Sequence, residues 1–220
     1  MNEEGKFNRI LRHARTRFFQ DGISCVTIEG LAKELGIAPE AISTHFKSKD
    51  ELLNKVVDDY VKDLSNQLDE IQSKPADFLD RVNELWVFAG KTFAAAGHDF
   101  KESIRANYPK HWERLNAFYR ERLLPVLSDQ MKQGVRMAVF RSDLNIEVAL
   151  MLFQNGIEQI ATPVVLAKNS YSTEDAIKSI LQLIFDGSLA DHTRTVFRRY
   201  AARVPRKNVV FKRVVLETHS

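Results

Sequence analysis

Residues 27–49 constrain this chain more than any other stretch, because their pattern predicts two short helices around one glycine. Apolar residues at helical spacing predict a first helix over residues 27–35 and a second over residues 38–46. Gly36 lies between them, where a tight turn needs the left-handed conformation that glycine adopts without steric cost. Pro39 falls in the first turn of the second helix, where a missing N–H is harmless. This arrangement predicts a helix-turn-helix.

A longer helix should begin directly after the second short one. Ser48 and Glu51 have the spacing of a capping box, in which Ser48 caps the third helical residue and Glu51 reaches back. Apolar residues then recur at helical spacing over residues 49–73, a length that could link two domains. The start of this helix, with Lys49, should lie beside the second short helix, as a phosphate contact requires.

These features resemble the TetR-type (tetracycline repressor-like) transcriptional regulators. The resemblance is specific over roughly residues 6–60, and beyond them only the pattern of helices is similar. The matching positions are Ile10, Leu11, Ala14, Phe18, Phe19, Gly22, Thr27, Ile28, Leu31, Ala32, Leu35, Gly36, Ile37, Ile42, Phe46, Ser48, Lys49, Leu52 and Leu53. The chain departs from the family at Glu40, where glycine is usual, and at Ser43 and His45, where the usual tyrosines commonly touch DNA phosphates.

The resemblance implies an all-α fold. Residues 1–50 would form the helix-turn-helix DNA-binding domain, and residues 51–190 a helical effector-binding and dimerisation domain. Helical spacing predicts a helix over residues 110–133, kinked at Pro125, and another over residues 146–165. Residues 191–220 would be a basic extension, a helix followed by a strand or tail, with eight Lys/Arg and two Asp/Glu.

Eight residues around the helix-turn-helix are candidate contacts to double-stranded operator DNA; the alternative is an ordinary three-helix packing motif. The side chains that suit phosphates are Thr27, His45, Lys47 and Lys49. Those placed for base edges and thymine methyl groups are Pro39, Ser43 and Thr44. Glu40 could accept a hydrogen bond from cytosine or repel phosphates. The basic residues of the first helix, some of which could add non-specific affinity, are Lys6, Arg9, Arg12, Arg15 and Arg17.

Two later helices carry broad apolar faces. In the family the corresponding helices build a two-fold, four-helix dimer interface, and the alternative is a core within one chain. A single helix-turn-helix reads too few bases for useful specificity, which also favours a homodimer. The candidate interface residues are Leu152, Gly156, Ile160, Ile180 and Ile184.

Aromatic residues are frequent in the second half of the predicted bundle. Together with a few polar groups they could enclose a pocket for a small, mostly apolar effector. The alternative is that each aromatic residue simply fills the core. The candidate pocket residues are Trp86, Phe93, Tyr108, Trp112, Phe118, Tyr119, Phe153 and Glu158.

Other function classes find little support in the sequence. The six histidines show no i, i+4 pair and have no cysteine partners, so neither a metal site nor a cofactor is expected. Gly90 begins a Gly-Lys-Thr triplet, but Leu85 stands where a phosphate-binding loop needs its first glycine. The single cysteine, Cys25, fits a reducing cytoplasm and is expected to be buried. No signal peptide and no membrane span are predicted.

The sequence therefore predicts a homodimeric DNA-binding transcriptional regulator. By resemblance it would be a repressor that a small effector releases from its operator. Two alternatives stay open at this point: a non-sensing architectural or interaction protein with the same DNA-binding domain, and an enzyme, for which the sequence offers no catalytic motif.

Overall fold

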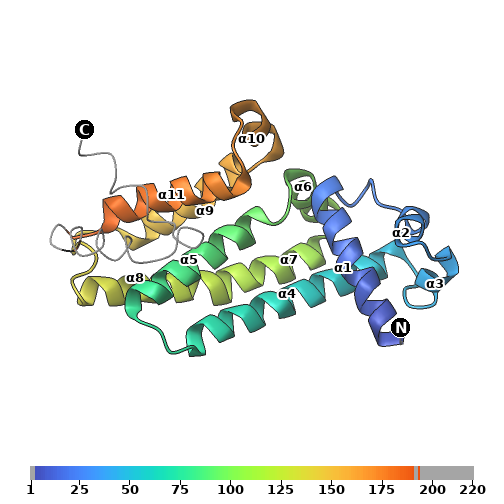
Figure 1. The fold of residues 1–220 in the computed structure, drawn as a ribbon, viewed down its shortest axis with the longest axis horizontal. Coiled ribbons are helices and arrows are strands. Elements are labelled where there is room, and N and C mark those ends of the chain that lie inside the picture. Colours follow the sequence, from blue (N-terminus) through green and yellow to red (C-terminus); the bar gives the residue numbers. More distant parts are fainter. Residues whose placement is uncertain (1–2, 191–192, 194–220) are drawn as a thin grey trace. The chain divides into compact units, whose positions relative to one another are not determined.

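The computed structural model describes residues 3–190 and residue 193, and the regular elements in this part of the chain are all helices (Figure 1). This confirms the all-α fold class. The only pairing of strand type that the described residues show is an isolated bridge between Phe140 and Leu189. The helix and strand expected after residue 190 lie outside the described residues. The elements are α1 (Glu3–Asp21), α2 (Ile28–Leu35), α3 (Pro39–Ser43), α4 (Lys49–Ser73), α5 (Phe78–Ala94), α6 (His98–Asn107), α7 (Pro109–Phe118), the π-helical turn η1 (Tyr119–Leu123), α8 (Leu124–Arg136), α9 (Ile146–Ile160), α10 (Pro163–Asn169) and α11 (Thr173–Ser188).

The described chain divides into two compact units. The first comprises Met1–Gln67 and Ala95–Arg120, and the second comprises Leu68–Ala94 and the residues from Glu121 onward. Residue 50, where the sequence places a domain boundary, falls inside the first unit, because α6 and α7 return to it and pack with α1 and with each other. The expected boundary at residue 50 therefore stays a prediction.

The helix-turn-helix occupies the expected place in the first unit. Gly36 ends α2 with φ +67° and donates from its N–H to the carbonyl of Lys33, so the left-handed turn is present. α3 is shorter than predicted and ends at Ser43. The spacing of Ile42 and Phe46 suits a longer helix, but the N–H of His45 bonds the carbonyl of Ile42, only three residues back, so the regular α-helical pattern gives way to a tighter turn.

The start of α4 differs in one detail from the expected capping box. The Ser48 hydroxyl accepts from the N–H of Glu51, as predicted. The Glu51 carboxylate instead accepts from the N–H of Lys47, at 2.8 Å, one residue before the expected donor. Both bonds hold the short segment between α3 and α4 in place.

Two sets of contacts fasten the rest of the first unit. The N–H of Gly97 donates to the carbonyl of Phe19, and a Cβ at Gly97 would lie only 2.9 Å from that oxygen. On α7, Arg114 donates to Asn54 at 2.7 Å and also bonds Asp58, so that α7 is held to α4. Cys25, in the segment between α1 and α2, is exposed rather than buried as expected.

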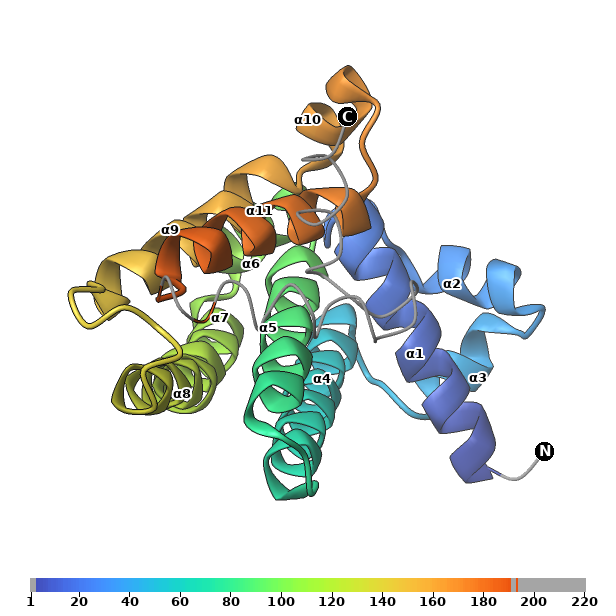
Figure 2. The same cartoon turned by 60° about the vertical axis from the view of Figure 1, so that its left-hand side comes forward.

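The second unit is organised by close helix packing. A Cβ at Gly90 would lie 2.6 Å from Ile177, so glycine permits the approach of α5 and α11. α9 and α11 lie side by side (Figures 1 and 2). Gly134 is buried within α8, where any Cβ would clash with the ring of Phe140.

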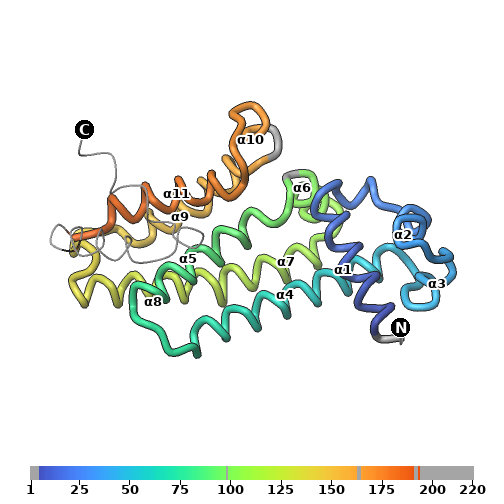
Figure 3. The backbone as a smooth tube through the Cα atoms, viewed as in Figure 1, coloured from blue at the N-terminus to red at the C-terminus, as the bar shows by residue number. Residues whose placement is uncertain are grey.

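Two predicted helices are divided in the structure. The helix expected over residues 110–133 becomes α7, η1 and α8, and the backbone passes through η1 without a loop (Figure 3). Pro125 lies in the first turn of α8, where its missing N–H costs least. The helix expected over residues 146–165 stops at Ile160, and Thr162 caps the new helix α10. The proline at position 163 explains the break, because the residue before a proline is disfavoured in a helix.

Candidate nucleic-acid interface

The outer side of α3 carries short polar side chains. Pro39, Glu40, Ser43 and Thr44 are all exposed. The Ser43 hydroxyl donates to the carbonyl of Pro39 at 3.3 Å, and the Thr44 hydroxyl donates to that of Glu40 at 2.8 Å. Because these protons are directed back into the helix, the hydroxyl oxygens face outward as acceptors, suited to the amino groups of adenine and cytosine.

Three of the candidate phosphate contacts surround α3 and the start of α2. Thr27 is exposed and its hydroxyl accepts from the N–H of Gly30 at 3.0 Å, which caps α2. Lys47 is exposed in the segment between α3 and α4. The His45 ring is half-buried and meets the ring of Phe7 edge-on, with centroids 5.7 Å apart. Thr27 and Lys47 thus lie open to a large ligand, whereas His45 is partly covered.

Lys49 has a different environment from the one expected. Its ammonium group donates to the carbonyl of Ile23 at 2.8 Å and to that of Val26 at 2.9 Å. These bonds use two of its three N–H donors and fasten the start of α4 to the segment between α1 and α2. These bonds give Lys49 a positioning role, and the expected phosphate contact of Lys49 stays a prediction.

Two basic residues of α1 make hydrogen bonds to other helices of the first unit. Arg9 donates to the carbonyl of Leu35 at 3.0 Å, and Arg15 donates to the carboxylate of Asp63 at 2.7 Å. Arg9 therefore links α1 to the end of α2, and Arg15 links α1 to α4.

Comparison with known proteins identifies this arrangement. Residues 10–56 match the family described as bacterial regulatory proteins, tetR family. The uncharacterized HTH-type transcriptional regulator YvaF of Bacillus subtilis is 23% identical over 186 residues, which cover 83% of this chain and 95% of the relative. The helix-turn-helix segment therefore matches the tetR family, and the chain as a whole resembles HTH-type transcriptional regulators. The chain is a DNA-binding transcriptional regulator, and the relatives it matches are regulators rather than enzymes.

Two further similarities extend over most of the chain. The HTH-type transcriptional repressor KstR2 of Rhodococcus jostii is 24% identical over 197 residues, covering 86% of this chain and 94% of the relative. The crystal structure of a transcriptional regulator from Saccharomonospora viridis, in complex with choline, has a TM-score of 0.68 at 21% identity. It covers 85% of this chain and 99% of its own, so the likeness in fold continues well beyond the helix-turn-helix.

The candidate effector residues come from both compact units, and the expected pocket stays a prediction. Trp86, Phe93 and Phe153 come together in the second unit, where the Trp86 and Phe153 ring centroids are 4.8 Å apart. Glu158 is half-buried in the same unit and accepts from Gln154 at 3.4 Å. The remaining four aromatic candidates belong to the first unit; they are Tyr108, Trp112, Phe118 and Tyr119.

Those four residues have packing roles in the first unit. Tyr108 stacks on His111, with their planes 9° apart, and the guanidinium of Arg105 lies 4.9 Å from the Trp112 ring centroid. Phe118 and Tyr119 are buried and in contact. The sequence pattern could not separate the two groups, since aromatic spacing along a helix does not show which unit the helix joins.

The core of the second unit contains polar atoms that the sequence did not single out. The indole Nε1–H of Trp86 is fully buried, and no described residue accepts its hydrogen bond. The side-chain amide of Gln130, on α8, is likewise buried and unpaired among the residues described. Buried polar groups are normally satisfied, so these two mark places where a polar ligand atom would be favourable.

The expected dimer residues fall into two groups. Leu152 and Ile160 are exposed on α9, at 62% and 41% of their full surface. Ile180 is buried, and its Cγ2 would lie 3.4 Å from a Cβ at Gly156, so this pair packs α9 on α11 within the chain. Ile184 is half-buried. Val148 and Met151 of α9 and Leu183 of α11 are exposed as well.

Two further observations concern other kinds of site. Over the described ranges, no group of three or more His, Cys, Asp or Glu residues could hold a metal ion. None of the described helices combines the length and apolar character needed to cross a membrane.

Proposed function

We propose that the protein is a homodimeric repressor that binds operator DNA through α3 and leaves it when a small molecule binds the second unit. The observation that carries this proposal is the pair α2 and α3 around Gly36, with short polar side chains exposed on α3. The relative named as a repressor, KstR2, supports the direction of regulation.

DNA recognition divides between two sets of residues. Pro39, Glu40, Ser43 and Thr44 face the base edges in the major groove, where the two hydroxyl oxygens accept hydrogen bonds and the threonine methyl contacts thymine. Thr27, Lys47 and His45 bind phosphates. Lys49 holds α4 in place behind them. In this division the residues of α3 determine the preference for a DNA sequence, and Thr27, Lys47 and His45 contribute affinity for DNA of any sequence.

The apolar face of α9 and α11 joins two chains. The two helices expose the apolar side chains of Leu152, Ile160 and Leu183 to water. This exposure is unfavourable in free energy, and burial of the side chains against a second copy of the chain removes it. Pairing also gives the protein two recognition helices. Two half-sites about 34 Å apart are then read together, which a single helix-turn-helix cannot do.

The effector binds among Trp86, Phe93, Phe153 and Glu158. These rings define a mostly apolar environment, and the unpaired indole N–H of Trp86 selects a ligand that carries a hydrogen-bond acceptor. The related structure with bound choline supports a small molecule as effector in this fold. Since Trp86 is fully buried, the effector has to separate these rings to enter, so it favours a different state of the second unit.

A selection from random duplex DNA tests the DNA-binding part. The protein should enrich a two-fold symmetric sequence, and the double variant Ser43→Ala with Thr44→Ala should lose that preference while keeping weak binding to all DNA. A matched control is Ser179→Ala, an exposed serine on α11, which should enrich the original sequence. Enrichment of one unchanged motif by the double variant would contradict the role of α3 in base recognition.

A ligand screen by thermal shift tests the effector part. A compound at about 100 times its dissociation constant should raise the free energy of unfolding by about 2.7 kcal/mol. Trp86→Phe keeps the ring but removes the N–H, so the compound should bind about tenfold more weakly. Trp112→Phe, in the first unit, is the control and should leave affinity unchanged. An effector that binds both variants equally would contradict the placement.

One observation favours a second candidate, a non-sensing architectural protein that uses the same DNA-binding domain. Trp86, Phe93 and Phe153 pack against one another, with Phe93 and Phe153 centroids 5.8 Å apart. A core that stays closed would accept no effector. If no compound in a broad screen raised the melting temperature while sequence-specific DNA binding persisted, this candidate would replace the sensing repressor.

A further inference from the structure

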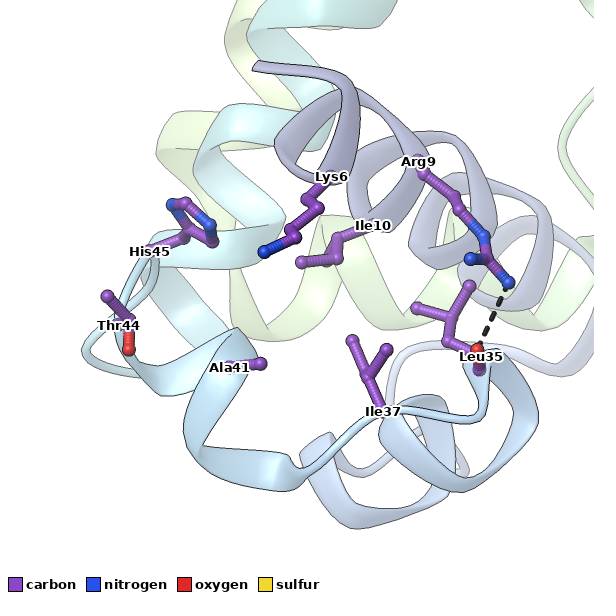
Figure 4. A pocket seen from close by; sticks show the side chains of 8 residues that line it. All are labelled: Lys6, Arg9, Ile10, Leu35, Ile37, Ala41, Thr44 and His45. Carbon is purple, nitrogen blue, oxygen red and sulfur yellow. Dashed lines mark hydrogen bonds between the residues drawn. The ribbon is translucent and has the colours of Figure 1, made fainter. Parts of the chain in front are cut away.

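The first unit contains a cavity beside the recognition helix that neither the family assignment nor the proposed effector site explains. It has a volume of about 330 Å³ and lies between α1, the end of α2 and α3 (Figure 4). Ligand pockets in proteins usually begin near this size, which suits a small molecule. The lining residues are Lys6, Arg9, Ile10, Leu35, Ile37, Ala41, Thr44 and His45.

The lining has two distinct parts. Ile10, Leu35, Ile37 and Ala41 form an apolar wall, and in Figure 4 their side chains converge between α1 and α3. The polar part is basic or neutral, because Lys6, Arg9 and His45 contribute to it and no aspartate or glutamate is among the lining residues. A ligand with an apolar body and an anionic group matches both parts.

The basic side chains can reach such an anion. The Lys6 ammonium group extends over the space between His45 and Ile10 (Figure 4). Arg9 donates to the carbonyl of Leu35 at 3.0 Å, and this single bond leaves most of the five N–H donors of its guanidinium group. A carboxylate near these two side chains would gain charge-assisted hydrogen bonds.

We propose that this cavity binds a small anionic amphiphile, a monocarboxylate with a short alkyl chain. The alkyl chain lies against Ile10, Leu35, Ile37 and Ala41, and the carboxylate meets Lys6 and Arg9. A DNA phosphate fits the basic rim but not the apolar wall, since it offers no group to cover those side chains.

Occupancy of the cavity has a direct consequence for DNA binding. Thr44 and His45 line the cavity and are also proposed DNA contacts, so the amphiphile and the operator compete for the same side chains. This release needs no conformational signal from the second unit. The predicted competition depends on the proposed DNA interface. Binding of the amphiphile to the cavity does not depend on that interface.

Titration of the full chain with octanoate, followed by two-dimensional amide NMR, tests the proposal without DNA. The amide signals of Ile37, Ala41 and Thr44 should shift together and saturate. The uncharged probe octanol should bind the same amides about five- to tenfold more weakly, because it lacks the contribution of the ion pair. Shifts confined to the second unit, or no shifts at millimolar octanoate, would overturn the proposal.

Two variants separate the contribution of the space in the cavity from that of the charge on its rim. Ala41→Phe fills the cavity and should abolish the octanoate shifts, while Ala106→Phe, an exposed alanine on α6 outside the cavity, should retain them. Lys6→Glu reverses one rim charge, so it should weaken octanoate binding about tenfold or more and leave octanol binding unchanged. This second variant keeps the test valid if Ala41→Phe fails to fold.

The DNA experiment gives the remaining outcomes. Octanoate should raise the apparent dissociation constant of the operator complex in direct proportion to its concentration, as a competitor does. If Lys6→Glu weakened DNA binding and octanoate bound nowhere in the first unit, the cavity would serve DNA alone and the proposal would be wrong. If octanoate bound the cavity and DNA affinity stayed constant, binding would stand and the proposed interface at Thr44 and His45 would not.

Discussion

Lys47 and Lys49 lie two residues apart, but their surroundings give them different roles. Lys47 is exposed beside α3, whereas Lys49 is half-buried and bonded to the carbonyls of Ile23 and Val26. A substitution at each position should therefore change a different measured quantity.

Lys47→Ala should weaken binding to all DNA sequences by a similar factor, because a phosphate contact carries no sequence information. The slope of log affinity against log salt concentration should fall by about one. Fluorescence anisotropy with operator and random duplexes, over a range of salt, measures both effects. Lys132→Ala, an exposed lysine on α8, is the control. A loss restricted to the operator would show that Lys47 reads bases.

Lys49→Met should instead lower stability. Methionine retains the aliphatic length but removes the donor to both carbonyls. The carbonyl of Ile23 keeps the N–H of Val26 at 3.4 Å, whereas the buried carbonyl of Val26 loses its partner, which costs about 1–3 kcal/mol. For a chain of this length that corresponds to a fall in melting temperature of about 2–12 °C. Lys55→Met, which changes an exposed lysine on the same helix, should have the melting temperature of the wild type. If Lys49→Met kept its melting temperature and lost one unit of salt slope, the phosphate role would be restored.

Asp59 gives a prediction about pH. Burial raises the pKa of the Asp59 carboxyl above its usual value, and the nearby charge of Asp63 raises it further, while Arg15 lowers it. The folded state therefore holds the proton more tightly than the unfolded state, so stability from this group is present at low pH and is lost as pH rises through the folded pKa.

It follows that Asp59→Asn should raise the melting temperature slightly at pH 7, and that the gain should disappear below about pH 4, near the unfolded pKa. Melting curves over pH 3–8 measure this, with the pH values chosen around the reference pKa of aspartate, about 3.9. Asp58→Asn is the matched control and should lower the melting temperature at pH 7, since Asp58 bonds Arg114. A lower melting temperature for Asp59→Asn at pH 7 would mean that its attraction to Arg15 dominates.

At the scale of helices, the clearest sequence signals gave the most accurate bounds. α4 runs from Lys49 to Ser73 as predicted, because Ser48 marks its start and a proline soon after residue 73 prevents its continuation. α3 was predicted too long, since apolar spacing continues past the turn that ends it. The division of the helix expected over residues 146–165 was missed for the same reason, although the proline at position 163 was a usable signal.

Other details of the elements depend on tertiary contacts. The π-helical turn η1 has no sequence signature that we could identify. The burial of Gly134 reflects the position of Phe140, which returns over α8 only in the folded chain. Likewise, the carbonyl partners of Lys49 come from a segment more than twenty residues earlier in the chain. Helical periodicity carries no information on such pairings.

The α9 and α11 pair provides a test of the dimer. Leu183→Arg should give monomers in sedimentation experiments, because it places a charge on an exposed apolar face, where Leu183 retains 75% of its surface. Loss of bivalent binding should then weaken operator affinity about a hundredfold or more. Met137→Arg, an exposed residue just after α8, should stay dimeric.

Gly156→Arg is a less specific probe of the same interface. A Cβ at this position already meets Ile180 within the chain, so the variant would disturb α9 and α11 even in a monomer. If Leu183→Arg stayed dimeric with unchanged operator affinity, the proposed interface would be contradicted. Because Leu183 is exposed, this variant does not disturb the packing of α9 on α11 within one chain.

At the scale of the whole molecule, the sequence predicted the helix-turn-helix and the all-α class, but it did not predict which segments form each compact unit. Residues 95–120 belong with the first unit although they follow α5 of the second. This return of the chain assigns Tyr108, Trp112, Phe118 and Tyr119 to the first unit, whereas Trp86 belongs to the second. Composition and spacing within each helix are the same for either assignment, so only the tertiary fold could decide it.

The exposed thiol of Cys25 makes the protein suitable for optical measurement of its own regulation. Because the sequence holds a single cysteine, a maleimide dye attaches at one known position per chain, in the first unit. A dimer labelled with a donor on one chain and an acceptor on the other then reports the separation of its two DNA-binding domains by energy transfer. Saturating effector should change the transfer efficiency, whereas a compound that fails to raise the melting temperature should not. Constant efficiency during operator release would exclude a change in that separation and would favour competition at the cavity beside α3.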